Sequence, residues 1–137
     1  MAQRPLPVPN AESRPFWEGA ARGVLRIQRC PACGAAQFPP RALCGHCHAK
    51  APPRWEEACG RGVIASHTTV HRAPSAAFRE EAPYTLALVT LEEGPRLLVR
   101  LRGAVAQAAR IGAPVVIGFD PPDGPDAIAL PHAEAAP

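Results

Sequence analysis

Two Cys-x-x-Cys pairs are the strongest chemical signal in the sequence. Cys30 and Cys33 form the first pair, and Cys44 and Cys47 form the second. Four thiolates that converge on one ion make a tetrahedral site of the kind that holds structural Zn²⁺ at about 2.3 Å. Because four protein ligands leave no open position for water, we expect a structural and not a catalytic metal in a zinc ribbon. Four thiolates also suit iron, so the choice between zinc and iron stays open.

Disulfides or a redox pair are the alternative uses of these cysteines. The polar, proline-containing start of the sequence has no export signal, so we expect a cytoplasmic protein with reduced thiols, which favours the metal. His46 and His48 flank Cys47 and could replace one sulfur ligand, although solvated histidines are the simpler interpretation.

Other residues that could do chemistry do not form a recognisable catalytic set. Cys59 has no evident base beside it, and His67 and His71 read as exposed strand residues that share a face. No Ser-His-Asp or Cys-His arrangement, no apolar carboxylate pair and no phosphate-binding glycine loop is evident. An independent enzyme is therefore the least supported function.

The composition of the 137 residues fits one domain, or a small zinc module with one compact domain. A net charge of +3 is too small to argue for nucleic acid by itself. No apolar run approaches the length of a membrane span, so we expect no membrane association of that kind.

A short helix is expected before the cysteines. Residues 1–13 should be extended, Ser13 is a candidate N-cap, and Gly23 should end the helix. Phe16 and Trp17 are two large apolar side chains on a short helix, so they should pack either on the chain's own domain or on a partner. We favour the partner, because so short an N-terminal helix has little else to bury them.

The rest of the chain reads as mainly β. A strand at 24–29 should feed the first cysteine pair, and 37–41 should be the return of the ribbon. Five further strands are expected, with a helical piece at 105–111 between the third and the fourth: 62–72, 84–91, 96–102, 115–119 and 127–130. That order matches a five-stranded OB-fold barrel, with an SH3-like barrel as the nearest rival. The predicted domains are an N-terminal extension and helix (1–23), the ribbon (24–54), the barrel (55–131) and a flexible tail (132–137).

Two of the expected strands have unusual patterns. Residues 84–91 are apolar on both faces, which barrel closure or a covering partner would explain. Residues 96–102 alternate, with leucines and valine on one face and Arg96, Arg100 and Arg102 on the other.

The combined motifs over residues 13–131 resemble the acyl-CoA-associated OB-fold proteins that carry an N-terminal rubredoxin-like zinc ribbon. The matching pieces are Ser13-x-Pro15-Phe16-Trp17-x-Gly19, Leu25-x-Ile27-Gln28-x-Cys30-x-x-Cys33-Gly34, Phe38-Pro39-Pro40-Arg41, Cys44-x-x-Cys47 and Gly60-x-Gly62-x-Ile64. The resemblance implies a four-cysteine zinc site at Cys30, Cys33, Cys44 and Cys47. It also implies a non-catalytic accessory subunit of a thiolase-like or lipid-transfer-protein-like enzyme that makes or breaks carbon–carbon bonds of acyl-CoA thioesters. Some members of that family are fused to hydratase-type domains, and no catalytic residue carries over.

Two other binding functions are open at this point. Single-stranded nucleic acid could use the arginine row, but the chain has only seven aromatic residues to stack on bases. The phosphates of CoA could pair directly with Arg41, Arg96, Arg100 and Arg102. Alternatively, acyl-CoA could meet the chain only as part of a complex with the partner enzyme. The alternative for these arginines is a solvated face that protects an edge strand.

Overall fold

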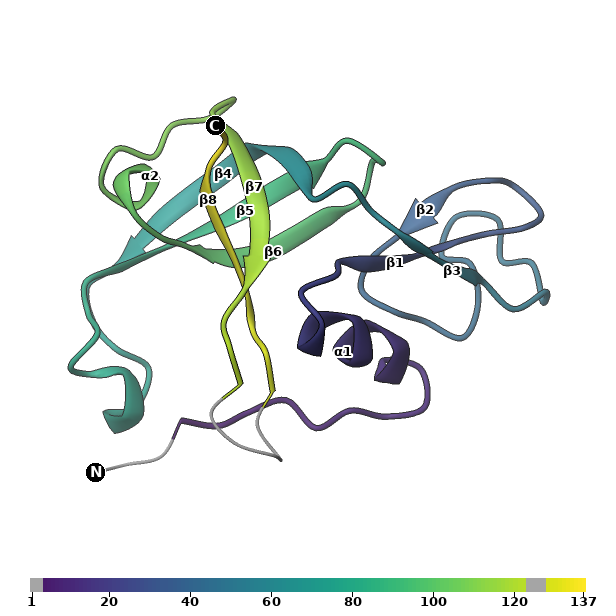
Figure 1. Ribbon diagram of the computed structural model, residues 1–137, viewed down its shortest axis with the longest axis horizontal. Coiled ribbons are helices and arrows are strands. Elements are labelled where there is room, and N and C mark those ends of the chain that lie inside the picture. Colours follow the sequence, from purple (N-terminus) through teal and green to yellow (C-terminus); the bar gives the residue numbers. More distant parts are fainter. Residues whose placement is uncertain (1–3, 123–127) are drawn as a thin grey trace.

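The computed structural model describes residues 4–122 and 128–137, which form a short helix, a three-stranded sheet and a closed five-stranded barrel (Figure 1). The predicted mainly β architecture is therefore confirmed. Among the described residues, no helix is both long and apolar enough to cross a membrane.

Helix α1 (Arg14–Ala21) starts at the predicted N-cap, but the cap works differently from the expectation. The Ser13 side chain does not bond to the helix; it accepts a hydrogen bond from the backbone N–H of Asn10 (3.0 Å). The backbone N–H of Ser13 donates in return to Asn10 Oδ1 at 2.8 Å. Gly23, at φ +75°, then turns the chain out of the helix.

The ribbon sheet has the order β2-β1-β3, formed by β2 (Ala36–Gln37), β1 (Arg26–Arg29) and β3 (Arg54–Glu57). The predicted boundary between residues 54 and 55 thus falls inside a strand that pairs with the first module. Of the expected return strand at 37–41, only its first residue belongs to a strand, β2. The end of this segment, Arg41, is bound by the side chain of Gln28 instead. The buried amide of Gln28 donates to the Arg41 carbonyl and accepts from the Arg41 N–H, both at 2.9 Å.

The barrel closes in the order β4-β5-β6-β8-β7, with the first strand paired to the last in that order. Strands β6 and β8 are parallel and the other pairs are antiparallel. Helix α2 (Ala104–Gln107) lies between the third and fourth strands, as predicted for an OB-fold, and a short 3₁₀ turn, η1 (Ala76–Phe78), lies in the loop after the first. The strands are β4 (Arg61–Val70), β5 (Tyr84–Leu91), β6 (Arg96–Leu101), β7 (Pro114–Phe119) and β8 (Pro131–Ala135).

The predicted flexible tail is wrong, because the last strand lies four residues further along than expected. The sequence suggested a strand at 127–130, of which Ala127 lies outside the described residues, and fraying from Pro131. Instead Pro131–Ala135 is strand β8, and Ala133 is fully buried between β6 and β7. Proline, alanine and glutamate are depleted in strands, so barrel closure and not local preference makes this segment a strand.

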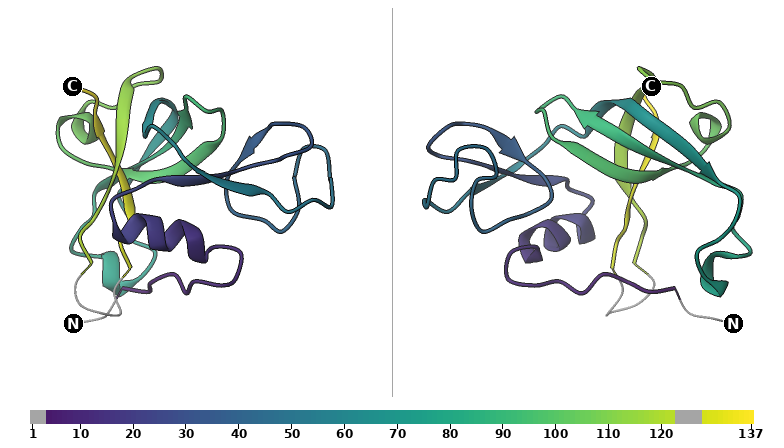
Figure 2. Two further views of the ribbon diagram at one scale, coloured as in Figure 1. Left: turned by 45° about the vertical axis from the view of Figure 1, so that its right-hand side comes forward. Right: turned by 180° about the vertical axis from the view of Figure 1, so that it is seen from behind.

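One continuous core joins the three parts. Phe16 of α1 and Ile27 of β1 pack in the same cluster as the barrel residues Ile64, Val89 and Val115. In two further views the helix lies between the ribbon and the lower end of the barrel (Figure 2). The ribbon is therefore held against the barrel by apolar packing as well as by the chain.

Candidate metal centre

The four predicted cysteines converge at the end of the ribbon. Their sulfur atoms lie within 4.8 Å of one another. Cys30 follows β1 directly, and the other three lie in two tight turns. The Sγ–Sγ distances are 3.6 Å for Cys30 and Cys47 and 3.7 Å for Cys33 and Cys44. A tetrahedron of Zn–S bonds of about 2.3 Å has edges of about 3.8 Å, so the geometry fits one zinc ion. All five cysteines of the chain are free of disulfides.

Backbone amides prepare two of these thiols for metal binding. The N–H groups of Cys47 and His46 donate to Cys44 Sγ at 3.4 and 3.3 Å, and they lower the pKa of this thiol to about 6. The N–H groups of Cys33 and Ala32 lower the pKa of Cys30 in the same way. Both thiols are buried, whereas their partners in each pair are exposed.

The neighbouring histidines do not join the site. His46 and His48 are exposed, and among the described residues the only group with metal-binding geometry consists of the four cysteines. A closed site of four sulfurs supplies no open coordination position. A metal held by these four sulfurs is therefore structural and not catalytic.

Cys59, the fifth cysteine, lies apart from the metal centre. Its thiol donates to Glu92 Oε2 at 3.3 Å, and its backbone N–H donates to Glu93. Cys59 is exposed, yet local desolvation and these carboxylates raise the pKa of its thiol, which is the opposite of what a nucleophile needs.

Two family models together match most of the chain. Residues 17–53 match the family described as ChsH2, rubredoxin-like zinc ribbon domain, and residues 55–120 match ChsH2, C-terminal OB-fold domain. The chain belongs to the ChsH2 family.

Several relatives share this arrangement. A probable enoyl-CoA hydratase alpha subunit of Thermomonospora curvata is 40% identical over 120 residues, which are 86% of this chain and 36% of the relative. The chain thus spans about a third of the length of that relative. A DUF35 domain-containing scaffold protein of Methanothermobacter thermautotrophicus is 32% identical over 95 residues, which are 69% of this chain and 71% of the relative.

A solved structure matches almost the whole chain. One chain of the structure titled Ltp2-ChsH2(DUF35) aldolase superposes with a TM-score of 0.80 at 35% identity. The match covers 96% of this chain and all of the other. The helix, ribbon and barrel therefore recur together in a family member of the same extent.

The four arginines predicted to meet CoA phosphates are not gathered in one place. Arg41 lies in the ribbon with its guanidinium against Gly45, and Arg96 and Arg100 lie on the outer face of β6. Arg100 and Arg102 line one polar cleft of about 490 Å³. Each of them already has a carboxylate partner, so a CoA contact stays a prediction best directed at Arg41 and Arg96.

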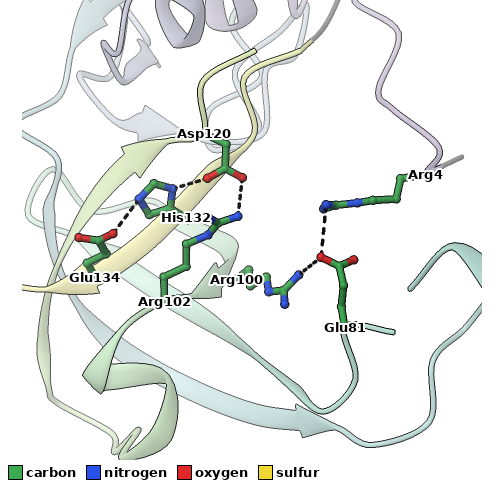
Figure 3. Close-up of polar contacts among 7 residues, drawn as sticks. All are labelled: Arg4, Glu81, Arg100, Arg102, Asp120, His132 and Glu134. Atoms are coloured by element: carbon green, nitrogen blue, oxygen red, sulfur yellow. Dashed lines mark hydrogen bonds and ion pairs between the residues drawn. The ribbon is translucent and has the colours of Figure 1, made fainter. Parts of the chain in front are cut away.

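Those partners were not evident from the sequence (Figure 3). Arg100 donates to Glu81 Oε1 at 2.9 Å, and Arg4 lies 3.4 Å from the same oxygen. Arg102 donates to Asp120 at 2.7 Å. These residues are far apart in the chain, and no spacing rule connects them.

A second polar cluster surrounds His132. Its Nδ1 atom lies 2.8 Å from Asp120 and its Nε2 atom lies 3.4 Å from Glu134 (Figure 3). Because the Nδ1 atom of His132 faces Asp120 at the end of β7, this cluster ties strand β8 to β7. The sequence reading missed this cluster because it placed His132 in the tail.

The predicted partner contact at Phe16 needs correction. Phe16 is only 2% exposed and packs against Phe38 and Phe119 of its own chain, with ring centroids 5.2 and 6.1 Å away. It is therefore not available to a partner. Trp17 remains half-exposed and lines a groove, so a docking role for Trp17 stays a proposal.

Proposed function

We propose that this chain is a non-catalytic accessory subunit of an acyl-CoA-handling enzyme. Its partner is a thiolase-like, lipid-transfer-protein-like subunit, and the complex makes or breaks carbon–carbon bonds of acyl-CoA thioesters. The observation that carries this proposal is the match, over 96% of the chain at 35% identity, to one chain of an Ltp2-ChsH2(DUF35) aldolase. The relative named as a subunit of an enoyl-CoA hydratase supports a role beside acyl-CoA enzymes more broadly.

The chemistry of the described residues supports an accessory role. The metal centre has four cysteine ligands and no open position, so it cannot activate water or a substrate. The thiol of Cys59 has a raised pKa. His67 and His71 are exposed and have no hydrogen-bond partner through their side chains in the described part of the chain. The reacting groups would therefore belong to the partner.

Zinc has a mechanical role in this proposal. When bound, it would fix the two knuckles at the end of the ribbon through Cys30, Cys33, Cys44 and Cys47. The knuckle turns connect to β1 and to the loop that contains Phe38, and that loop packs on Phe16. Loss of the ion should loosen the ribbon and, through this packing, the surface between the ribbon and the barrel.

The test is purification of the tagged chain from its native cell, with any co-purifying protein identified by mass. A thiolase-like enzyme in stoichiometric amount supports the proposal. That enzyme is then assayed for carbon–carbon cleavage of an acyl-CoA thioester with and without the chain. If the chain purifies alone, or if its omission leaves the rate unchanged, the proposed function is refuted.

A further inference from the structure

The outer face of strands β5 and β6 carries a row of leucines. Leu86 and Leu88 alternate with the core residues of β5, and Leu88 lies directly opposite Leu98 of β6. Leu98 is 62% exposed, and the other two leucines are half-buried. A strand face that meets water normally carries polar side chains. The aliphatic row therefore indicates a surface that is covered in the working protein.

Among the described residues, no helix or strand lies over this face; the N-terminal segment approaches its edges, where Arg4 shares Glu81 with Arg100 and Asn10 lies beside Leu98. The view from behind shows β4, β5 and β6 in front, with α1 and the ribbon beside them (Figure 2, right). Leu86 and Leu88 have Thr68 and Ser66 of β4 as their neighbours, so the leucine row ends at a polar strand on that side. The apolar surface must continue in the other direction, past β6.

A groove of about 330 Å³ begins at Leu98 and continues the apolar surface between the barrel and the helix. Its apolar walls include Trp17 from α1, Phe38 and two prolines from the ribbon loop, and Leu98 from β6, and Asn10 and Ser13 lie at its polar side. The leucine row and this groove form one surface, which we call the leucine face: Leu86, Leu88, Leu98, Trp17, Phe38, Pro39 and Pro40.

The charges beside the leucine face decide what can cover it. Arg96 and Arg100 lie two residues before and two residues after Leu98, on the same side of β6. Arg96 is exposed and has no ion pair within residues 4–122 and 128–137. A second copy of the chain, related by a two-fold axis near Leu98, would bring arginine against arginine in either orientation. Such like-charge contacts oppose association.

Nucleic acid also fits the leucine face poorly. An OB-fold holds single strands by stacking bases on aromatic rings in a basic groove. Here the central strand positions are leucines, and Tyr84 at the end of β5 is already covered by the guanidinium of Arg100, 4.8 Å from its ring. Aliphatic side chains offer packing area without stacking, and this is what a protein surface requires.

We propose that the leucine face docks the thiolase-like partner through an apolar patch of that enzyme edged by a carboxylate, which meets Arg96. This docking surface rests on the proposed function, and it specifies where on the chain the partner binds. It also explains why β5 is apolar on both of its faces: one face fills the barrel and the other meets the partner.

The experiment measures binding of the chain to the purified enzyme identified in the co-purification, by calorimetric titration at low and moderate salt. Leu98→Asp places a charge at the centre of the leucine face, and Kd should rise by roughly thirtyfold or more, as expected for a central interface residue. Arg96→Glu should also weaken binding, and the salt dependence of Kd should become smaller. Ile111→Asp is the matched control, because Ile111 is 72% exposed away from this face, and it should bind as the wild type does.

The outcomes separate the surface from the function. Zinc content and thermal midpoint should be unchanged in each variant, because the substituted side chains are exposed; Arg96→Glu carries the test if Leu98→Asp does not fold. A wild-type chain that fails to bind the enzyme overturns the proposed function and the docking surface together. A wild-type chain that binds, with both variants binding equally well, overturns the surface alone. A wild-type dimer that Leu98→Asp separates would identify a second copy as the occupant and would also overturn it.

Discussion

Replacing Phe16 with alanine should destabilise the whole chain, because this one ring joins the helix, the ribbon and the barrel. Its centroid lies 4.8 Å from Trp17, 5.2 Å from Phe38 and 6.1 Å from Phe119, and the side chain is 2% exposed. Truncation of a buried phenylalanine usually costs about 3–5 kcal/mol. The short helix can partly close the resulting space, so we expect a loss of about 3 kcal/mol, a large share of the roughly 5–15 kcal/mol that stabilises a domain.

Urea unfolding with zinc in excess measures this loss by two probes. Tryptophan fluorescence reports on α1 and β3, which carry Trp17 and Trp55, and circular dichroism reports on the barrel. The two transitions of the wild type should coincide, because one core joins the parts. Phe78→Ala is the matched control: this half-exposed ring contacts only Tyr84 among the aromatic residues described, at 6.3 Å, and its loss should cost about 1 kcal/mol or less.

Two results would refute the reasoning. If Phe16→Ala lowers the free energy of unfolding by less than about 1 kcal/mol, the ring does not hold the parts together. If stability is unchanged but binding to the partner is lost, Phe16 is a docking residue, as the short helix first suggested, and its burial in the isolated chain is not its working state.

Three further predictions concern the metal, one glycine and one ion pair. Acid should release the zinc, because protons compete with the ion for the four thiolates. Backbone N–H groups lower the folded-state pKa of Cys44 to about 6, so the stability that its thiolate contributes is complete above the unfolded pKa and is lost as the pH falls through the folded one. A colorimetric assay that finds the same zinc content in acid as at neutral pH would contradict this. Gly62→Ala should cost roughly 1–3 kcal/mol in urea unfolding, because a Cβ there would lie 2.5 Å from the Thr90 carbonyl oxygen, and an unchanged midpoint would show that β4 and β5 separate freely. Glu81→Gln should lower the free energy of unfolding by no more than about 1 kcal/mol, because the Glu81–Arg100 ion pair is partly exposed, and the loss should shrink in high salt. A larger loss that does not depend on salt would mean that the Glu81 carboxylate is needed for packing.

The metal site could be predicted from the sequence because its ligands lie close together in the chain. The spacing within each Cys-x-x-Cys pair places its two sulfurs in one turn, and a short hairpin brings the two pairs together. The barrel strands were predictable for a related reason. The alternation in residues 96–101 reports directly on which side chains are buried, and Leu97 and Arg96 lie on the expected faces.

The missed features all depend on contacts between distant residues. Strand β8 forms because β6 and β7 offer backbone hydrogen-bond partners on both sides. A local pattern of alanines does not predict these partners. The ion pair of Asp120 with Arg102, like the contact of Phe16 with Phe119, exists only after the barrel has closed. A short amphipathic helix shows that an apolar side must be covered, but it does not show whether the cover comes from its own chain.

The boundary between the ribbon and the barrel falls within strand β3 and not in a loop, and this affects how ribbon and barrel domains can be exchanged between proteins. A chimaera joined at residue 54 would combine one parent's β1 with the other parent's β3. The backbone hydrogen bonds of this ladder would have to form between the two parents, and the facing side chains would have to keep its register. Several side-chain contacts would have to be matched across the junction, among them Arg29 with Glu56 at 2.7 Å, Arg26 over the ring of Trp55 and Phe16 against Phe119. A transplanted ribbon therefore brings a requirement for an acidic residue into its host, so shuffling of these modules should leave correlated changes at positions 29 and 56.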